Sequence, residues 1–140
     1  MKTRMFLMLG AVALLAVLPT ALQAQEQLLF RVNIPFEFIA SGVHMPAGEY
    51  MGFHTTPSLI QVVREDGRAS AWVHVKASPV ANGETQNQLV FNRYGDTYFL
   101  AKITTGHDQQ EHECFRCRAE QTLAAQYAPA KPETVLVAMH

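Results

Sequence analysis

The sequence predicts a mainly β protein, a single antiparallel β-sandwich or barrel of about 7–8 strands with one C-terminal α-helix. Short runs of β-branched and aromatic residues alternate with turn signals between Leu28 and Thr105. No helical period interrupts these runs, which favours an antiparallel sheet. The hydrophobic period changes to that of a helix only after Gly106, so we expect the helix near the C-terminal end.

The first 24 residues are predicted to be a cleaved signal peptide. Lys2 and Arg4 precede an apolar run over residues 5–18, and Ala24 ends a stretch of small residues typical of a cleavage site. The run is shorter than the roughly 20 apolar residues of a membrane-spanning helix, although an uncleaved anchor or a buried helix is an alternative. We therefore expect residues 25–140 to form one domain, periplasmic or secreted, with no stable membrane span.

Composition narrows the classes of partner. The signal segment carries two of the 11 basic residues and none of the 12 acidic ones, which leaves 116 residues with 9 basic and 12 acidic side chains and a formal charge of −3. This balance predicts no nucleic-acid partner and no anionic membrane surface. A domain of this size can bury a core without a metal or many disulfides.

The longest alternating pattern predicts a half-buried strand. One face of it carries the apolar residues Leu28, Phe30, Val32, Ile34, Phe36 and Phe38. Pro35 cannot donate to a ladder, so we expect this strand to lie at an edge or to bend there. Turns are predicted at Ser41-Gly42 and at residues 45–48.

Three shorter strands are predicted over residues 49–54, 59–64 and 69–76. Gly52 within the first of them indicates a bulge or a close approach of another group. In the third strand, Ala71, Val73 and Val75 share one face, and Trp72, His74 and Lys76 share the other. The polar residues 78–88 predict a loop.

A hairpin around Gly95-Asp96 is the centre of the predicted fold. With these two residues as its loop, Tyr94 faces Thr97, Arg93 faces Tyr98 and Phe91 faces Leu100, and Gly95 takes a positive φ. Alternation then places Leu89, Phe91, Tyr98 and Leu100 on one face, and Val90, Phe99, Ala101 and Ile103 on the other. Because both faces carry apolar groups, we expect the hairpin to be covered on each side. Arg93 and Asp96 could form a surface salt bridge of small energetic value.

A helix is predicted over about residues 109–127, with Asp108 as its N-cap. Its apolar positions, Phe115, Ala119, Leu123 and Tyr127, recur at a spacing of four. Pro129 and Pro132 end it. Residues 134–139 predict a last strand that covers a sheet edge, with a disordered tail as the alternative.

Cys114-Phe115-Arg116-Cys117 is the motif of greatest chemical interest. Its C-x-x-C spacing is used in thiol redox chemistry, in zinc sites and in haem attachment. Haem attachment is excluded because Arg118 stands where a histidine is required. Within the predicted helix the cysteines lie away from the N-terminus that would lower a thiol pKa, which disfavours redox activity. A structural disulfide or a pair of buried thiols is the favoured interpretation.

Metal binding is a weaker alternative for this motif. His107 and His112 lie just upstream, but His112 points away from Cys114 on a helix, and a fourth ligand would have to come from elsewhere. The other histidines, His44, His54, His74 and His140, are scattered. No G-x-S-x-G, Gly-rich phosphate loop or H-E-x-x-H motif is present, so we predict no catalytic residues and no cofactor. The candidate carboxylates for acid–base chemistry, Glu37, Glu49, Asp66 and Asp96, fall on separate elements.

Four segments resemble a family of short exported bacterial proteins with no known activity. They are residues 30–38 (FRVNIPFEF), residues 45–50 (MPAGEY), residues 89–100 (LVFNRYGDTYFL) and Arg118-Ala119-Glu120. The resemblance implies export and a β-rich fold, and it supplies no catalytic residues. The cysteine pair departs from the family's pattern, so any redox or metal role would belong to this protein alone.

The favoured function is that of a non-enzymatic, exported β-domain that binds or scaffolds a component of the cell envelope. A thiol redox protein using Cys114 and Cys117 is one alternative. A carrier that holds a small apolar ligand inside a barrel is another, because the first strand offers a long aromatic face. A filled core would favour the scaffold, and an open cavity would favour the carrier.

Overall fold

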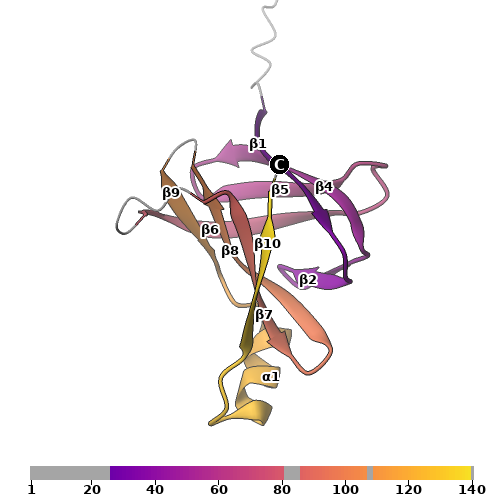
Figure 1. Cartoon of the computed structure of the whole chain (residues 1–140), viewed down its shortest axis with the longest axis vertical. Coiled ribbons are helices and arrows are strands. Elements are labelled where there is room, and N and C mark those ends of the chain that lie inside the picture. The colour runs from indigo at the N-terminus through magenta and orange to yellow at the C-terminus, as the bar shows by residue number, and fades with distance from the viewer. Residues whose placement is uncertain (1–25, 81–85, 107–108, 140) are drawn as a thin grey trace, which may run out of the picture.

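The structure, a computed structural model, describes residues 26–80, 86–106 and 109–139. The predicted signal peptide, the middle of the predicted loop, His107, Asp108 and His140 lie outside the described residues. The elements are β1 (Gln27–Ile34), β2 (Phe38–Ala40), β3 (Val43–Met45), β4 (Gly48–Thr56), β5 (Leu59–Arg64), β6 (Ser70–Pro79), β7 (Gln88–Tyr94), β8 (Thr97–Thr105), β9 (Gln110–Cys114), α1 (Arg118–Tyr127) and β10 (Glu133–Ala138). Figure 1 shows a curved sheet with α1 at one end.

All ten strands belong to one sheet, and a helix lies near the C-terminal end, which confirms the predicted mainly β class. The sheet is not closed into a barrel. The strand order is β1-β4-β5-β6-β9-β8. At β8 the sheet divides: β8 pairs with β7, which pairs with β10, and it also pairs with β2, which pairs with β3. The contact between β2 and β8 is parallel and joins Ile39 to Phe99, whereas the other pairings are antiparallel.

The first predicted strand is interrupted at Pro35, because proline has no backbone N–H to donate to a neighbouring strand. β1 ends at Ile34, and the chain resumes pairing in β2. The predicted alternation is wrong at its start, where Leu28 is 50% exposed. The register shifts between Leu28, which pairs with Phe53, and Phe30, which pairs with Gly52, so one extra residue turns Leu28 to the outer face.

Gly52 provides the close approach that the sequence predicted. A Cβ atom at this position would lie 2.1 Å from Cε1 of Phe30, whose ring occupies the space beside the glycine. The ring is buried, so a side chain at Gly52 would displace part of the core. The glycine therefore allows the aromatic ring of β1 to lie flat against β4.

The central hairpin has the predicted register. Tyr94 pairs with Thr97, Arg93 with Tyr98 and Phe91 with Leu100, and Gly95 has a φ of +62°. The prediction for Ile103 is wrong, because the register shifts between Val90 and Phe91. Val90 faces Lys102, so Ala101 is an extra residue in β8 that returns Ile103 to the face of Leu89 and Phe91.

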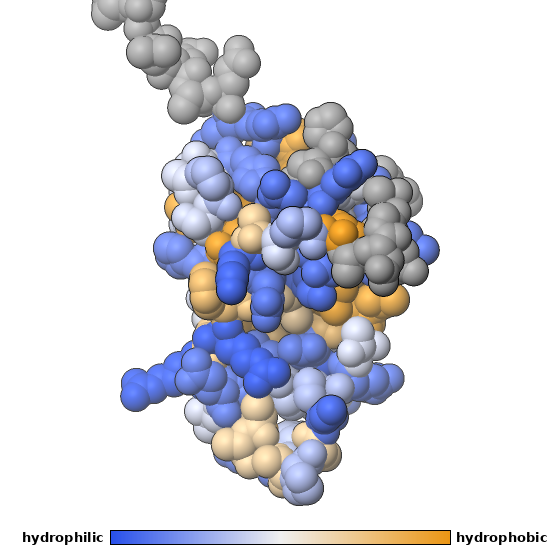
Figure 2. Space-filling model, turned by 90° about the vertical axis from the view of Figure 1, so that its left-hand side faces the viewer, coloured by the Kyte–Doolittle hydropathy of each residue, from blue (hydrophilic) through white to orange (hydrophobic). Residues whose placement is uncertain are grey.

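Both faces of the hairpin are covered, as predicted. The main core fills the concave side of the sheet and includes Phe38, Tyr50, Phe91, Leu100 and Ile103. A second, smaller core comprises Ile39, Tyr94 and Phe99, with Leu123 and Ala124 of α1 packed against it. Figure 2 shows one outer face, where hydrophilic residues predominate and hydrophobic residues appear in smaller areas between them.

The helix is shorter than predicted, and the correction changes the position of the cysteines. Residues 110–114 form strand β9 between β6 and β8, and α1 begins at Arg118 with Cys117 as its N-cap. The alternate residues His112 and Cys114 are buried there, because two neighbouring strands offer hydrogen bonds that override the local helical pattern. The helix ends before Pro129 and Pro132, as predicted, and β10 covers the edge of β7.

Candidate binding cleft and the cysteine pair

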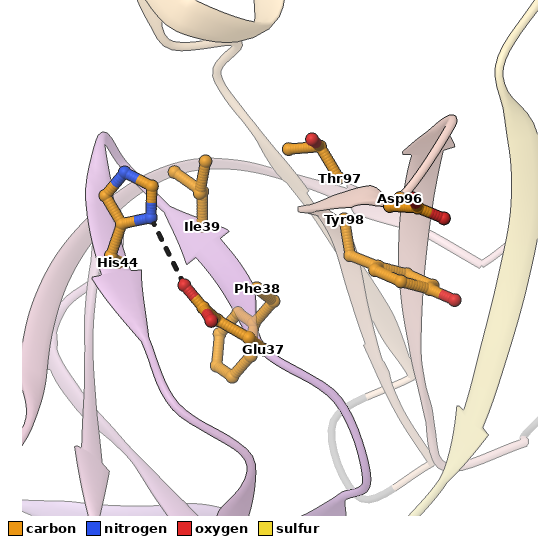
Figure 3. A pocket seen from close by; sticks show the side chains of 7 residues that line it. All are labelled: Glu37, Phe38, Ile39, His44, Asp96, Thr97 and Tyr98. Carbon is orange, nitrogen blue, oxygen red and sulfur yellow. Dashed lines mark ion pairs between the residues drawn. The ribbon is translucent and has the colours of Figure 1, made fainter.

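A cleft of about 180 Å³ opens between the β2–β3 hairpin and the β7–β8 turn. Its lining residues are Glu37, Phe38, Ile39, His44, Asp96, Thr97 and Tyr98. In Figure 3, Glu37 and His44 point toward one another on one side of the cleft, and Asp96, Thr97 and Tyr98 lie on the other side. Two hairpins that are far apart in the sequence thus form the two walls.

Aromatic packing holds these walls in place. The ring of Phe36 stacks on Tyr98 with a centroid distance of 4.0 Å and contacts Phe91 edge-on at 5.0 Å. Phe38 lies in the core, where its ring contacts Phe91 at 5.5 Å. The parallel pairing of Ile39 with Phe99 then fixes β2 beside the start of β8. Because both walls are anchored to the main core, we expect the cleft to be largely preformed.

Two carboxylates and one imidazole of the cleft are accessible to solvent. A carboxylate oxygen of Glu37 lies 3.6 Å from Nδ1 of His44, and both side chains are more than 70% exposed. Asp96 is fully exposed at the opposite wall. Thr97 and Tyr98 add hydroxyl groups beside an apolar floor. These groups can accept and donate hydrogen bonds and can pair with a cation.

Arg93 is close to the cleft, but it is held by other contacts. Its guanidinium lies 3.6 Å from Glu133 and 3.9 Å from Asp96, and Nε donates a hydrogen bond of 2.7 Å to the carbonyl of Gly95. The guanidinium carbon also lies 5.3 Å from the centre of the Tyr98 ring. The predicted Arg93–Asp96 pair is therefore present, and Arg93 contacts two residues that line the cleft, Asp96 and Tyr98, and two outside it, Glu133 and Gly95.

A buried carboxyl group on α1 was not anticipated from the sequence. Glu120 is 3% exposed and accepts hydrogen bonds from Asn92 (2.9 Å) and from the Tyr94 hydroxyl (3.4 Å). Nε of Arg116 lies 3.8 Å from the same oxygen. Burial, followed by the charge of Glu120, raises the pKa of Tyr94, so its hydroxyl keeps the proton that it donates. The arrangement attaches the helix to β7.

The cysteines occupy two different environments. Cys114 is buried at the end of β9, whereas Cys117 is half-buried at the N-cap of α1, and both are free thiols. Burial, and to a smaller extent the negative charges of Glu120 and Glu113, raises the pKa of the Cys114 thiol to about 12. The predicted placement of both cysteines inside a helix is wrong. The sequence favoured either a structural disulfide or buried thiols. Cys114 is a buried thiol, and no disulfide joins it to Cys117.

This thiol should make stability fall with pH in a predictable window. The folded protein retains the Cys114 proton up to a pKa of about 12, whereas the unfolded chain releases it near 9.0, so unfolding becomes more favourable as pH rises above 9.0. The slope is about 1.4 kcal/mol per pH unit, which gives a loss of about 2 kcal/mol at a pH of about 10.5. Denaturant unfolding of wild type and Cys114→Val at neutral and alkaline pH measures this difference.

Cys117→Ser is the matched control, because it removes a thiol that is only partly buried, at the margin of the second core. We expect its stability to fall with pH as that of wild type does, whereas Cys114→Val should lose less. If wild type and Cys114→Val decline in parallel up to a pH of about 10.5, the Cys114 thiol is not desolvated and the prediction is wrong.

Of the two histidine candidates for metal binding, His107 lies outside the described residues and only His112 can be placed. His112 is buried on β9, and its ring contacts that of His54 with a centroid distance of 5.0 Å. Within residues 26–80, 86–106 and 109–139, no cluster of three His, Cys, Asp or Glu side chains is placed to hold a metal ion. Over the same residues, no helix is long and apolar enough to cross a membrane.

The hairpin residues singled out in the sequence fall into two groups, those that stabilise the fold and those that line the cleft. Phe91 and Leu100 lie in the core, and Gly95 forms the turn, whereas Asp96 and Tyr98 line the cleft. The sequence places Glu37 and Asp96 on separate elements and does not predict that they share a site. The parallel contact between β2 and β8 brings those elements together, and no local pattern in the sequence signals it.

The chain matches no family model, no curated protein and no solved structure. The resemblance of its motifs to a family of exported bacterial proteins stays a prediction.

Proposed function

We propose that this protein is a non-enzymatic, exported binding domain of the cell envelope, and that its cleft accepts a positively charged group of a partner. The observation that carries the proposal is the pair of exposed carboxylates, Glu37 and Asp96, on opposite walls of a cleft anchored to the core. A lysine or arginine side chain entering the cleft would meet the Glu37 carboxylate, and the Asp96 carboxylate, which points outward in Figure 3, adds negative charge at the rim of the opposite wall. Thr97 and Tyr98 offer further hydrogen-bond partners.

The electrostatic balance around the cleft supports a cationic guest. Arg93, the nearby described cation, contacts Glu133 and the carbonyl of Gly95 as well as Asp96, so a guest would share Asp96 with it. Both cleft carboxylates face solvent, so each ion pair is expected to contribute only about 0.2–1 kcal/mol. The proposal therefore predicts modest affinity that falls as salt screens the charges. Such binding suits a domain that holds a partner rather than one that transforms it.

The packing of the interior supports binding at the surface over carriage of an apolar ligand inside the sheet. Phe38 contacts Tyr50 edge-on at 5.2 Å and Phe91 at 5.5 Å, so aromatic side chains fill the concave side. One observation favours redox chemistry: Cys117 lies at a helix N-cap, a position that favours the thiolate form of cysteine. Against it, the pKa of about 12 for Cys114 keeps the second thiol protonated.

The expected result is that short lysine- and arginine-containing peptides bind the purified protein at low salt, whereas glutamate-containing peptides of equal length do not. The double variant Glu37→Gln/Asp96→Asn should weaken binding by about tenfold, which corresponds to about 1.4 kcal/mol shared between two pairs. Isothermal titration calorimetry, or chemical-shift changes at Thr97 and Tyr98, provides the measurement.

Glu65→Gln is the matched control, because it removes an exposed carboxylate that pairs with Arg31 at a different site. It should leave peptide binding unchanged. Equal weakening by the control and by the double variant would show a general effect of net charge, and the proposed site would then be wrong.

A further inference from the structure

His44 gives the cleft a group of a type whose charge depends on pH. It lies on β3, where it pairs with Ile39 of β2, and its side chain lines the cleft. Histidine is the side chain that ordinarily changes charge between about pH 5 and 8, whereas carboxylic acids ionise near pH 4 and tyrosine near about pH 10. Among the described lining residues, His44 is therefore the one that can alter the charge of the cleft in this range.

The ring of His44 lies beside the carboxylate that a cationic guest would meet. Nδ1 of His44 is 3.6 Å from a carboxylate oxygen of Glu37, and the dashed line in Figure 3 marks this contact. Both side chains are more than 70% exposed, so a guest can reach both of them. A protonated ring forms an ion pair with Glu37, whereas a neutral ring leaves the carboxylate its full negative charge.

The two carboxylates of the cleft differ in the cation that accompanies them. Asp96 lies 3.9 Å from Arg93, a permanent cation that offsets part of its charge and also contacts Glu133 outside the cleft. In the described part of the chain, the ion pair of Glu37 is the one with His44. Glu37 therefore presents its full charge to a guest only when His44 is neutral.

The elements around β3 leave this pair as the charged groups that face each other. β2 carries only apolar residues. β6 contacts β2 and β3, but its titratable residues, His74 and Lys76, are exposed on its outer side. On β4, Glu49 borders a different depression, which it shares with Arg64. Across the cleft from His44 stands Asp96, whose negative charge would also attract a protonated ring.

We infer that His44 regulates the binding of a cationic guest by pH, which rests on the proposed function of the cleft. When the ring gains a proton, it competes with the guest for Glu37 and repels the guest. Two unit charges about 4 Å apart in water interact by an amount that equals a fivefold change in affinity. Because the cleft is open to solvent, we expect binding to be about threefold to fivefold tighter at pH 7.5 than at pH 5.5.

The test uses an acetylated, lysine-containing peptide without histidine or acidic residues, whose charge is constant over this range. Chemical-shift titrations of Thr97 and Tyr98 at an ionic strength of about 0.1 M give the affinity, while salt screens charges more than about 10 Å away. His44→Gln should bind equally well at both pH values, close to wild type at pH 7.5. Near pH 6.5, binding to wild type should release part of a proton, which calorimetry in two buffers of different ionisation enthalpy measures. His44→Gln should release none.

His74→Gln is the matched control, because it removes an exposed histidine of β6 that does not line the cleft. It should keep the pH dependence of wild type. The inference is overturned, and cation binding stands, if wild type binds equally well at both pH values or more tightly at pH 5.5. The same holds if His44→Gln keeps the dependence, or if His74→Gln removes it as fully. Absence of peptide binding at both pH values overturns the proposed function and this inference with it.

Discussion

Phe91→Ala is expected to lower the free energy of unfolding by about 3–5 kcal/mol. Phe91 is wholly buried at the centre of the main core, where it pairs with Leu100 and contacts the rings of Phe36 and Phe38. Removing its ring would leave a cavity among Leu100 of β8, Phe38 of β2 and Phe36, which lies between β1 and β2. The surroundings can therefore collapse only in part, and the loss should fall in the upper part of the range for buried aromatic residues.

Urea or guanidinium unfolding of wild type and Phe91→Ala gives the free-energy difference. Leu136→Ala is the control, because it truncates an apolar side chain that is mostly exposed on neighbouring β10 and should change stability by less than about 0.5 kcal/mol. A cost below about 1 kcal/mol for Phe91→Ala would be incompatible with a ring buried at the centre of the core.

Glu120→Ala is expected to destabilise the protein by about 2–4 kcal/mol, with the largest effect at α1. The substitution leaves the amide of Asn92 and the buried hydroxyl of Tyr94 without their acceptor. It also removes the partner of Arg116. Only part of this cost is recovered from the higher helix propensity of alanine and from no longer burying a carboxyl group.

Denaturant unfolding measures the total, and hydrogen exchange at residues 118–127 measures the local opening of α1. Gln126→Ala, at an exposed position of the same helix, should be close to neutral. A double-mutant cycle with Asn92→Ala isolates the hydrogen bond, and a coupling energy near zero would show that Glu120 does not attach the helix to β7.

The antiparallel part of the fold could be predicted because its signals are local. The Gly95-Asp96 turn sets the register of β7 and β8, and the alternation of Ala71, Val73 and Val75 sets the buried face of β6. Pro35 likewise marks the end of β1 correctly. In each case a short stretch of chain contains both the geometry and the reason for it.

The errors come from interactions between distant segments. Residues 110–114 satisfy a helical pattern in isolation, but in the fold they form β9 between β6 and β8. The bulges that turn Leu28 and Ile103 to unexpected faces are single extra residues in otherwise regular strands. A one-residue shift reverses every later side chain, so a small geometric event produces a large error in the predicted faces.

The cleft could be predicted only in its parts. Asp96 and Glu37 were candidate carboxylates from their residue type, but their common location depends on the parallel contact of Ile39 with Phe99. The attachment of Glu120 to Asn92 and Tyr94 has the same character, because it joins two segments that the sequence presented only as separate motifs. Residue type suggested the chemistry, and long-range topology decided which groups meet.

The pairing of β7 with β10 has a consequence for the order in which the protein acquires its structure. β7 is the outer strand of the central hairpin, and residues 133–138 supply the hydrogen bonds of its second edge. Ribosomes release a chain from its N-terminal end, so the hairpin at residues 88–105 emerges with that edge unsatisfied. Until β10 arrives, β7 is an open edge with which any other strand can pair. We therefore expect the hairpin to depend on chaperones for protection from aggregation until residues 133–138 have been synthesised.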